Sequence, residues 1–194
     1  MPEPESAVLP IRLQIGAYTL DAARPDDVDA VVAAFADPDI ARWNPGARSP
    51  GSTAQDRARR WVAYRTSWTR DHCSWVIRDA DRRLVGQVSI HSIDEDMGNG
   101  EIGYWLTPDG RGRGIGSAAV DTATRFAFDL LGLVRLELFH AVANEASCRL
   151  ARRCGYLVEG TARQSFVYGD GLRHDEHLHA RLAADAVEPV PLPR

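Results

Sequence analysis

The sequence predicts a mixed α/β (α+β) fold, in which about four helices flank a mostly antiparallel sheet of about seven strands. Three observations predict it. Apolar residues follow helical spacing in two early segments. Between residues 74 and 106 they alternate with polar residues or run continuously, as in strands. Residues 102–139 then have the pattern of one strand–turn–helix–strand unit. Because a helical crossover makes the strands before and after it parallel, one parallel pair is expected within the antiparallel sheet.

Length and composition limit the organisation of the chain. With 194 residues it favours one domain with its own core. We predict that this domain spans residues 11–182, and that the proline-rich ends, 1–10 and 183–194, are flexible tails. No apolar run approaches the roughly 20 residues needed to cross a bilayer, and the first ten residues do not resemble a secretory signal.

Charge and cysteine content narrow the function classes. A net charge of -4 argues against a general nucleic-acid binder, because affinity for the phosphate backbone comes from clustered basic residues. The three cysteines make an odd count without metal-type pairing, as expected for reduced thiols. The sequence therefore predicts a cytoplasmic protein that binds neither nucleic acid nor membrane.

The elements of the first half begin with a strand over residues 18–23. A turn with a capping carboxylate at 24–27 then opens a helix from Val28 to Phe35, and the Asp-Pro-Asp run at 37–39 ends it. A loop at 44–52 follows, rich in proline, glycine and serine. Ser52 or Thr53 caps a second helix over 54–68, and three strands expected to pair as an antiparallel meander then follow at 74–77, 84–90 and 102–106.

The second half opens with a helix whose apolar stripe runs from Ile115 to Leu130 and which ends at Gly132. A strand over 134–139 completes the parallel pair. The chain then continues with a helix over 144–153, closed by Gly155, and with strands over 156–158, 163–167 and 177–182.

The turn at residues 107–116 carries the main functional signal, because its last seven residues include four glycines. Glycine allows close approach of a ligand and positive φ, and the unpaired N–H groups of the following helix point outward at the positive end of its dipole. Arg111 and Arg113 add charge suited to phosphate oxygens. The turn is predicted to bind an anion, with pyrophosphate as the expected guest; a tight connection without a ligand is the alternative.

Other nucleotide motifs fit this turn less well. The order Gly112-x-Gly114-x-Gly116 lacks the spacing of the G-x-G-x-x-G dinucleotide fingerprint. No Gly-Lys-Ser or Gly-Lys-Thr follows for a nucleoside triphosphate. A redox enzyme with a nicotinamide cofactor is therefore a disfavoured alternative.

Three motifs in order carry a family resemblance. Arg111-x-x-Gly114-x-Gly116 after the strand at 100–108 resembles the acetyl-coenzyme A signature of the GNAT superfamily of N-acetyltransferases. Residues 144–147 and 152–160 resemble the Asn-x-x-Ser helix and Gly-Phe-x-x-Glu-Gly strand of its RimJ/RimL-like branch, and Arg163 with 171–175 resembles its late hairpin. The resemblance spans roughly residues 18–182. It implies a GNAT-like fold whose parallel strands splay apart, and an enzyme that transfers acetyl from acetyl-CoA, or another acyl group from its CoA thioester, to a primary amine by direct attack in a ternary complex.

The resemblance also implies the cofactor site. Pyrophosphate would rest on the amides of the turn, the pantetheine arm would insert between the splayed strands, and an amide near Trp105 or Leu106 would polarise the thioester carbonyl. The predicted cofactor-binding residues are Tyr104, Trp105, Leu106, Arg111, Gly112, Arg113, Gly114, Ile115, Gly116, Ser117, Asn144 and Ser147.

Two catalytic residues follow from the same resemblance. Ser147 matches the residue proposed in this branch as the acid that protonates the departing thiolate, since Ala151 stands where the wider superfamily has a tyrosine. Glu101 is the predicted base for the amine, with solvent as the alternative. Phe166 occupies the place of the branch's other candidate acid, which puts base catalysis from that strand in doubt.

Alternatives stay open beside this assignment. His177 and His179 lie on one side of a strand with Asp175, yet a solvated strand face is preferred and no metal is predicted. Because Phe166 and Ala151 stand where catalytic side chains are expected, a non-catalytic acyl-CoA-binding sensor is a second possible function. A succinyl-CoA-dependent transferase is a third. A protein N-terminus and a small-molecule amine are both open as acceptors, as is a homodimer.

Overall fold

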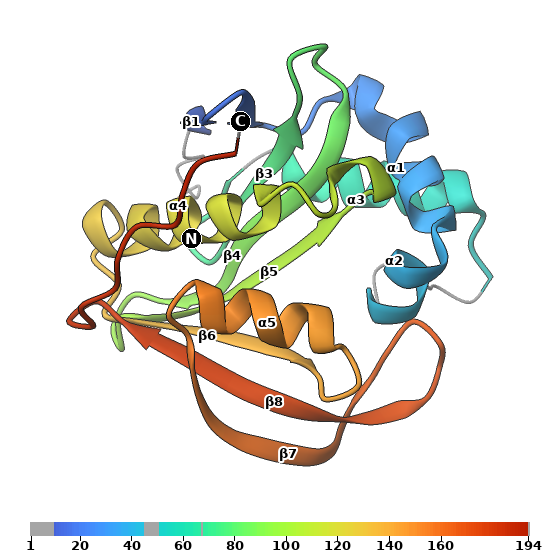
Figure 1. The fold of residues 1–194 in the computed structure, drawn as a ribbon. Helices are drawn as coiled ribbons and strands as arrows, with labels where there is room; N and C mark the ends of the chain where they lie inside the picture. Colours follow the sequence, from blue (N-terminus) through green and yellow to red (C-terminus); the bar gives the residue numbers. More distant parts are fainter. Residues whose placement is uncertain (1–9, 45–50, 67, 194) are drawn as a thin grey trace, which may run out of the picture.

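The computed structural model describes residues 10–44, 51–66 and 68–193, which form one eight-stranded sheet in the order β1-β2-β3-β4-β5-β6-β8-β7 with helices on both faces (Figure 1). The strands are β1 Leu13–Ile15, β2 Tyr18–Asp21, β3 Cys73–Arg78, β4 Leu84–Asp94, β5 Asn99–Leu106, β6 Arg135–Ala141, β7 Leu157–Val167 and β8 Arg173–Leu182. The helices are α1 Val28–Ala36, α2 Pro38–Trp43, α3 Ala54–Arg65, α4 Ile115–Asp129 and α5 Glu145–Arg153.

The central strands are buried on both faces, as β3 illustrates. Trp75 and Ile77 belong to a core cluster that includes the apolar side of α4, whereas Val76 between them belongs to the cluster formed by α1 and α3. This alternation follows from the pleat, which directs successive side chains to opposite faces. The sheet is therefore the middle layer between α4 on one side and the α1–α3 pair on the other.

The predicted parallel pair is confirmed and is short. β5 and β6 pair only from Asn99↔Arg135 to Glu101↔Glu137. β5 continues to Leu106 and β6 to Ala141 without further pairing between them among the described residues. The two strands thus separate toward the end of β5, where the glycine turn leads into α4. The mostly antiparallel sheet and the predicted meander of β3, β4 and β5 are also confirmed.

Several boundaries differ from the sequence prediction. The strand predicted at 18–23 is the second arm of a β1–β2 hairpin. The Asp-Pro-Asp run at 37–39 ends α1 and also begins α2, because Asp37 accepts a hydrogen bond from the Ile40 N–H at 3.0 Å and Pro38 occupies the first turn. The strands predicted at 156–158 and 163–167 are one strand, β7, whose two register irregularities break the local pattern.

The ends of the chain bear on the predicted domain limits. Residues 1–9, and 45–50 of the predicted loop, lie outside the described residues. The segment 183–193, predicted as a flexible tail, forms no helix or strand but runs along the domain (Figure 1). Val190 is buried there and its N–H donates to Asp121 at 3.3 Å. No helix of the described chain is long and apolar enough to cross a membrane.

Candidate active site

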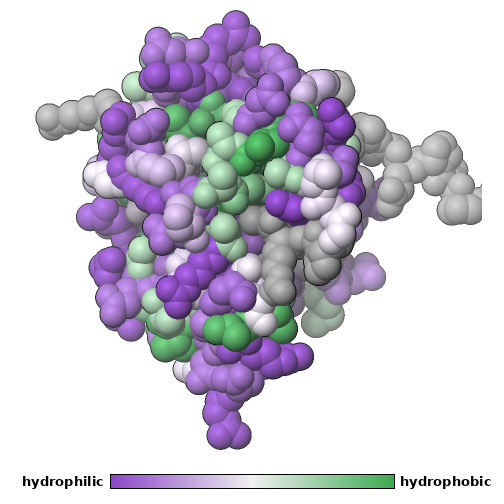
Figure 2. Space-filling view, turned by 90° about the vertical axis from the view of Figure 1, so that its right-hand side faces the viewer, coloured by the Kyte–Doolittle hydropathy of each residue, from purple (hydrophilic) through white to green (hydrophobic). Residues whose placement is uncertain are grey.

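A cavity of about 1060 Å³ lies between the separated ends of β5 and β6 and is closed by residues of α2, α3, α5 and β8. Figure 2 shows the face of the molecule that carries α1, α2 and the β7–β8 turn, where apolar side chains gather in the middle and polar ones surround them. Among the predicted site residues, those that line the cavity are Glu101, Tyr104, Trp105, Leu106, Arg111, Gly112, Asn144 and Ser147.

The glycine turn has the backbone geometry of an anion site. Gly112 and Gly114 have φ of +74° and +76°. At either residue, no heavy atom of the described chain other than its direct neighbours lies within 4 Å of the position that a Cβ would take. The N–H groups from Gly112 to Ser117 have no acceptor within the described chain. Because the first N–H groups of α4 are free and the turn is open on this side, a phosphate group can be bound there by amides alone.

The residues after the turn serve packing as well. A Cβ on Gly116 would lie 2.9 Å from Leu150 Cδ1 and 3.0 Å from Leu106 Cδ1, so this glycine lets α4 approach α5 and β5 closely. Ile115 and Ser117 are buried in the same first turn of α4. Their side chains therefore position the helix, and only their amides remain for a ligand.

The two arginines of the turn make contacts that the sequence does not predict. The Arg111 guanidinium pairs with Asp37 and, at 3.0 Å, with Asp39, and its Nε donates to the Leu106 carbonyl at 3.2 Å. Although burial opposes the shift, the hydrogen bond from Arg111 lowers the pKa of Asp37. Arg111 thus ties the turn to α2 instead of presenting a free charge, and the exposed Arg113 lines a different, smaller cavity.

Ser147 is held at the cavity wall by two hydrogen bonds. Asn144 is the N-cap of α5, and its Oδ1 accepts from the Ser147 N–H at 3.2 Å. The Tyr104 hydroxyl from β5 donates to Ser147 Oγ at 3.0 Å. Burial raises the pKa of Tyr104, with the hydrogen bond to Ser147 acting in the opposite direction, so the phenol stays protonated. The hydroxyl hydrogen of Ser147 is therefore left to donate to another group in the cavity.

Glu101 lies on β5 directly opposite His91 of β4. Its carboxylate is 38% exposed, and Oε2 is 3.9 Å from His91 Nδ1. Burial lowers the pKa of His91, an effect that Glu101 opposes and Arg65 of α3 reinforces. Glu101 is thus an accessible carboxylate on the cavity wall, separate from the Ser147–Tyr104 pair.

Sequence reasoning missed a second carboxylate, Glu176 of β8. It is buried at the cavity wall and accepts hydrogen bonds from the hydroxyls of Tyr168 and Ser165, both at 2.8 Å. Burial and the neighbouring Glu176 raise the pKa of Tyr168. Phe166 also lines the cavity, so the carboxylate of the late hairpin that reaches the cavity lies on β8, one strand away from the position considered in the sequence.

The fold and the site together define a protein with unpaired amides at the start of α4 and a cavity that continues from there, between β5 and β6, to Ser147. This is the layout of a protein that can hold a long ligand with an anionic group at one end. The chain belongs to the GNAT acetyltransferase family: the family model described as Acetyltransferase (GNAT) domain matches residues 18–157. Enzymes of this family use acetyl-CoA.

Individual relatives agree with the assignment. The chain is 39% identical to YdaF of Bacillus subtilis over 95 residues, which are 49% of this chain and 51% of YdaF. It is 27% identical to spermidine N(1)-acetyltransferase of Vibrio cholerae over 92 residues, 47% of this chain and 53% of the relative. The matches to these curated relatives thus span about half of their length.

A solved structure extends the likeness over the whole fold. The ribosomal-protein-S5-alanine acetyltransferase from Vibrio fischeri superposes with a TM-score of 0.76, covering 92% of this chain and 100% of that one at 20% identity. At this identity the similarity establishes the fold. The mixed sheet with its separated parallel strands is therefore the GNAT architecture.

Proposed function

We propose that this protein transfers an acetyl group from acetyl-CoA to a primary amine by direct attack in a ternary complex. The observation that carries the proposal is the set of unpaired amides from Gly112 to Ser117 at one end of a cavity whose walls are two separated parallel strands. Pyrophosphate binds to the amides, and pantetheine lies along residues 102–106 of β5, which form no ladder with β6.

The side chains on the wall complete the proposed reaction. The amine nitrogen attacks the thioester carbon, the carbon–sulfur bond breaks, and the thiolate takes a proton from Ser147. Ser147 takes a proton from Tyr104 in the same step, and Tyr104 regains its proton from water in the cavity. Glu101 accepts the proton that the amine loses, directly or through water. Each carboxylate oxygen of Glu176 accepts a hydrogen bond from a hydroxyl group, which fixes the position of the carboxylate. We therefore assign Glu176 the role of binding the positive charge of the acceptor.

We infer an acceptor that is cationic in solution. Four carboxylates line the cavity, from Asp39, Glu101, Glu145 and Glu176. Arg111 already pairs with Asp39, and Trp43 and Trp61 line the cavity beside these carboxylates. An ammonium group is attracted both to carboxylates and to aromatic faces. A protein N-terminus is favoured over a polyamine because an α-amine has a pKa near 8 and loses its proton more readily than an alkylamine with a pKa near 10.

The test has two stages. Acetyl-CoA, succinyl-CoA, free CoA and NAD are compared by thermal shift, and acetyl-CoA at about 100 times its Kd should add about 2.7 kcal/mol to the free energy of unfolding. Release of free thiol is then followed with N-terminal peptides and with polyamines. Stabilisation without any amine-dependent thiol release would instead support a sensor, and stabilisation by NAD alone would contradict the proposal.

The contribution of the turn can be tested with a matched pair of glycine variants. Gly112 and Gly132 have φ of +74° and +70°, and among the residues that the structure describes, only their direct chain neighbours come within 4 Å of the position that a Cβ would take. Alanine should cost each site a similar strain of about 1 kcal/mol. Only Gly112→Ala should weaken acetyl-CoA binding, by about tenfold, because its methyl group lies beside the amides that hold the pyrophosphate. Calorimetric titration measures both, and equal affinities would remove the turn from the binding site.

The cytoplasmic location, the limits of the domain and a homodimeric assembly stay predictions from the sequence. So does the absence of nucleic-acid and membrane partners.

A further inference from the structure

A second polar cluster lies under α5, next to the transfer cavity. It consists of His140 from β6, His177 and His179 from β8, and Cys148 from α5, and one donor atom from each side chain lies within 4.8 Å of all the others. We propose that this His₃Cys cluster binds one transition-metal ion of the Zn²⁺ class.

Strand pairing brings the histidines together. His140 is directly opposite His177 in the antiparallel β6–β8 pair, and His179 lies two residues further along the same face of β8. α5 lies over β6 (Figure 1) and carries Cys148, whose Sγ reaches His179 Nε2 at 3.9 Å. The four residues come from three elements, so only the folded chain forms the cluster.

The distances suit tetrahedral coordination. His140 Nε2 and His179 Nε2 are 3.0 Å apart, and Cys148 Sγ is 3.9 Å from His179 Nε2. An ion with bonds of about 2.0–2.1 Å to nitrogen and about 2.3 Å to sulfur separates its ligand atoms by about 3.3–3.6 Å. The two separations lie within about 0.3 Å of this range. Because all four donor atoms lie within 4.8 Å of one another, the widest pair would have to close by at most about 1.2 Å to enclose such an ion.

The hydrogen bonds of two rings fix which nitrogen faces the centre. His140 Nδ1 lies 2.8 Å from the Ala141 carbonyl, and His179 Nδ1 lies 3.2 Å from the Tyr156 carbonyl. A carbonyl oxygen only accepts, so each Nδ1 carries the hydrogen and each neutral ring presents an Nε2 lone pair. Two lone pairs face each other at 3.0 Å, which requires a cation between them. A ring N–H bonded to a backbone carbonyl is also the usual outer support of a metal-binding histidine.

The remaining donors favour a metal ion over a shared proton. A proton between His140 and His179 would leave Cys148 and His177 directed at the same point without a function. His177 Nδ1 is buried and has no hydrogen-bond partner among the described residues. Arg152 adds repulsion for any cation near the two rings, which a Cys148 thiolate would offset in a metal complex. Imidazole with one thiolate is a donor set that suits Zn²⁺.

This cluster differs from the one considered in the sequence. The sequence groups Asp175 with His177 and His179, but Asp175 accepts a hydrogen bond from the Gln164 N–H at 2.8 Å and is not part of the cluster. Four protein ligands leave no open position, so we assign the ion a structural role. Because Cys148 follows Ser147 and His140 lines the transfer cavity, the ion would fix the start of α5 against β6 and β8.

The test uses the full-length protein without a polyhistidine tag, first stripped with a chelator and then titrated with Co²⁺. One equivalent should bind with a thiolate-to-cobalt charge-transfer band and the intense visible absorption of a tetrahedral complex, and Zn²⁺ should displace it and raise the Tm by several degrees. Cys148→Ser should abolish the charge-transfer band, whereas the control Cys154→Ser, which alters a buried thiol outside the cluster, should retain it.

Two results would overturn the proposal. One is the absence of a stoichiometric cobalt spectrum and of any Zn²⁺ effect on the Tm of the native-sequence protein, a measurement that needs no variant to fold. The other is an unchanged charge-transfer band in Cys148→Ser. If His140 and His179 share a proton instead, neither Co²⁺ nor Zn²⁺ should have an effect. NMR would then show a protonated ring pair both in the metal-free and in the metal-treated protein.

Discussion

Replacing Ser147 by alanine is expected to lower kcat about 100-fold, the lower end of what a positioned general acid contributes, while the Kd for acetyl-CoA changes little. The reason is geometric. Ser147 Oγ receives a hydrogen bond from the protonated Tyr104 and can pass its own proton to the thiolate, whereas its contribution to holding CoA is one hydroxyl among many contacts. Stopped-flow detection of free thiol measures kcat, and calorimetric titration measures Kd.

Two further variants define what the Ser147 result means. Tyr104→Phe removes the donor but keeps the ring, so kcat should fall about tenfold if Tyr104 resupplies the proton. Ser74→Ala is the matched control, because Ser74 is a buried serine of β3 whose hydroxyl has no partner among the described residues and which does not line the cavity. Wild-type kinetics in Ser147→Ala would exclude Ser147 from the chemistry, and a similar loss in Ser74→Ala would indicate a general effect on folding.

Local sequence predicts the parts of the site that lie close together in the chain. The glycine turn and its helix, and the Asn144–Ser147 cap of α5, each fall within one short segment, where residue type and spacing determine geometry. The bond between Tyr104 and Ser147 joins residues 43 positions apart and depends on how α5 packs against β5. The sequence therefore predicts Tyr104 as a cofactor contact without its bond to Ser147.

Arg111 shows why a charge near a predicted ligand site is weak information. Its position beside the glycines suggests a phosphate contact, but α2 places Asp37 and Asp39 within reach and satisfies the guanidinium. The sequence shows the Asp-Pro-Asp run only as the end of α1, so the competing partners are not expected in that place. A charged side chain pairs with whichever opposite charge the tertiary fold brings nearest.

The order of the last strands explains the other omissions. The sequence predicts late strands, but not that β8 inserts between β6 and β7. This insertion places His140 beside His179 and directs Glu176 into the cavity. No local pattern contains that information, because it depends on which edge of β6 the returning chain pairs with.

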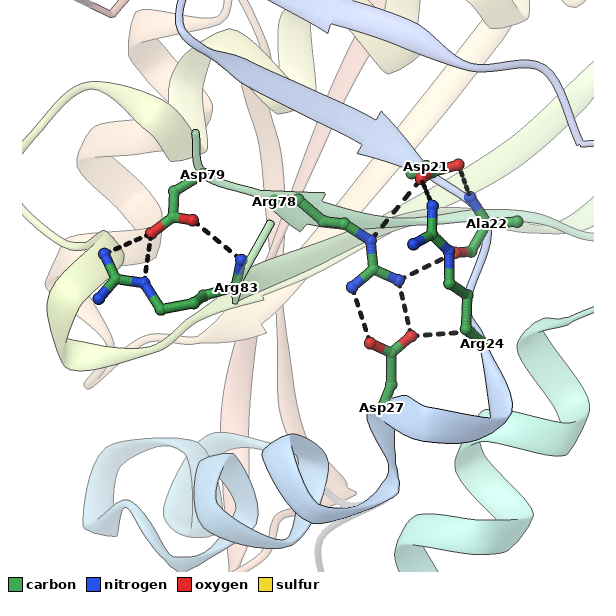
Figure 3. Close-up of polar contacts among 7 residues, drawn as sticks. All are labelled: Asp21, Ala22, Arg24, Asp27, Arg78, Asp79 and Arg83. Atoms are coloured by element: carbon green, nitrogen blue, oxygen red, sulfur yellow. Dashed lines mark hydrogen bonds and ion pairs between the residues drawn. The ribbon is translucent and has the colours of Figure 1, made fainter. Parts of the chain in front are cut away.

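The largest effect on stability is expected at the start of α1, where Asp27→Ala should lower the free energy of unfolding by about 3–5 kcal/mol. Arg78 of β3 and Asp27 form two parallel hydrogen bonds of 2.7 and 2.8 Å, and both side chains are only 6% exposed (Figure 3). Although burial opposes the shift, Asp27 raises the pKa of Arg78. Removal of the carboxylate leaves a buried guanidinium whose nearest remaining carboxylate, that of Asp21, is 3.7 Å away.

A nearby pair gives the control for this prediction. Arg83 binds Asp79 at 2.8 Å in the same view, but its side chain is 72% exposed (Figure 3). Arg83→Ala removes a guanidinium that water already solvates, and Asp79 keeps its hydrogen bond from the backbone N–H of residue 83 at 2.9 Å. The free energy of unfolding should therefore be nearly unchanged. Urea denaturation measures both variants, and comparable losses would mean that burial does not determine the strength of these pairs.

The double variant Asp27→Ala with Arg78→Met separates two causes of the loss. If the cost comes from the unpaired buried charge, removing that charge should restore a large part of the stability, because an apolar pair of similar volume can match a buried ion pair. Asp27 also accepts the Arg24 N–H at 2.7 Å, and that capping bond stays broken in the double variant. If the losses of unfolding free energy in the two single variants simply add in the double variant, the cost comes from the capping bond and from packing. If the double variant recovers stability, the cost comes from leaving the charge of Arg78 buried and unpaired.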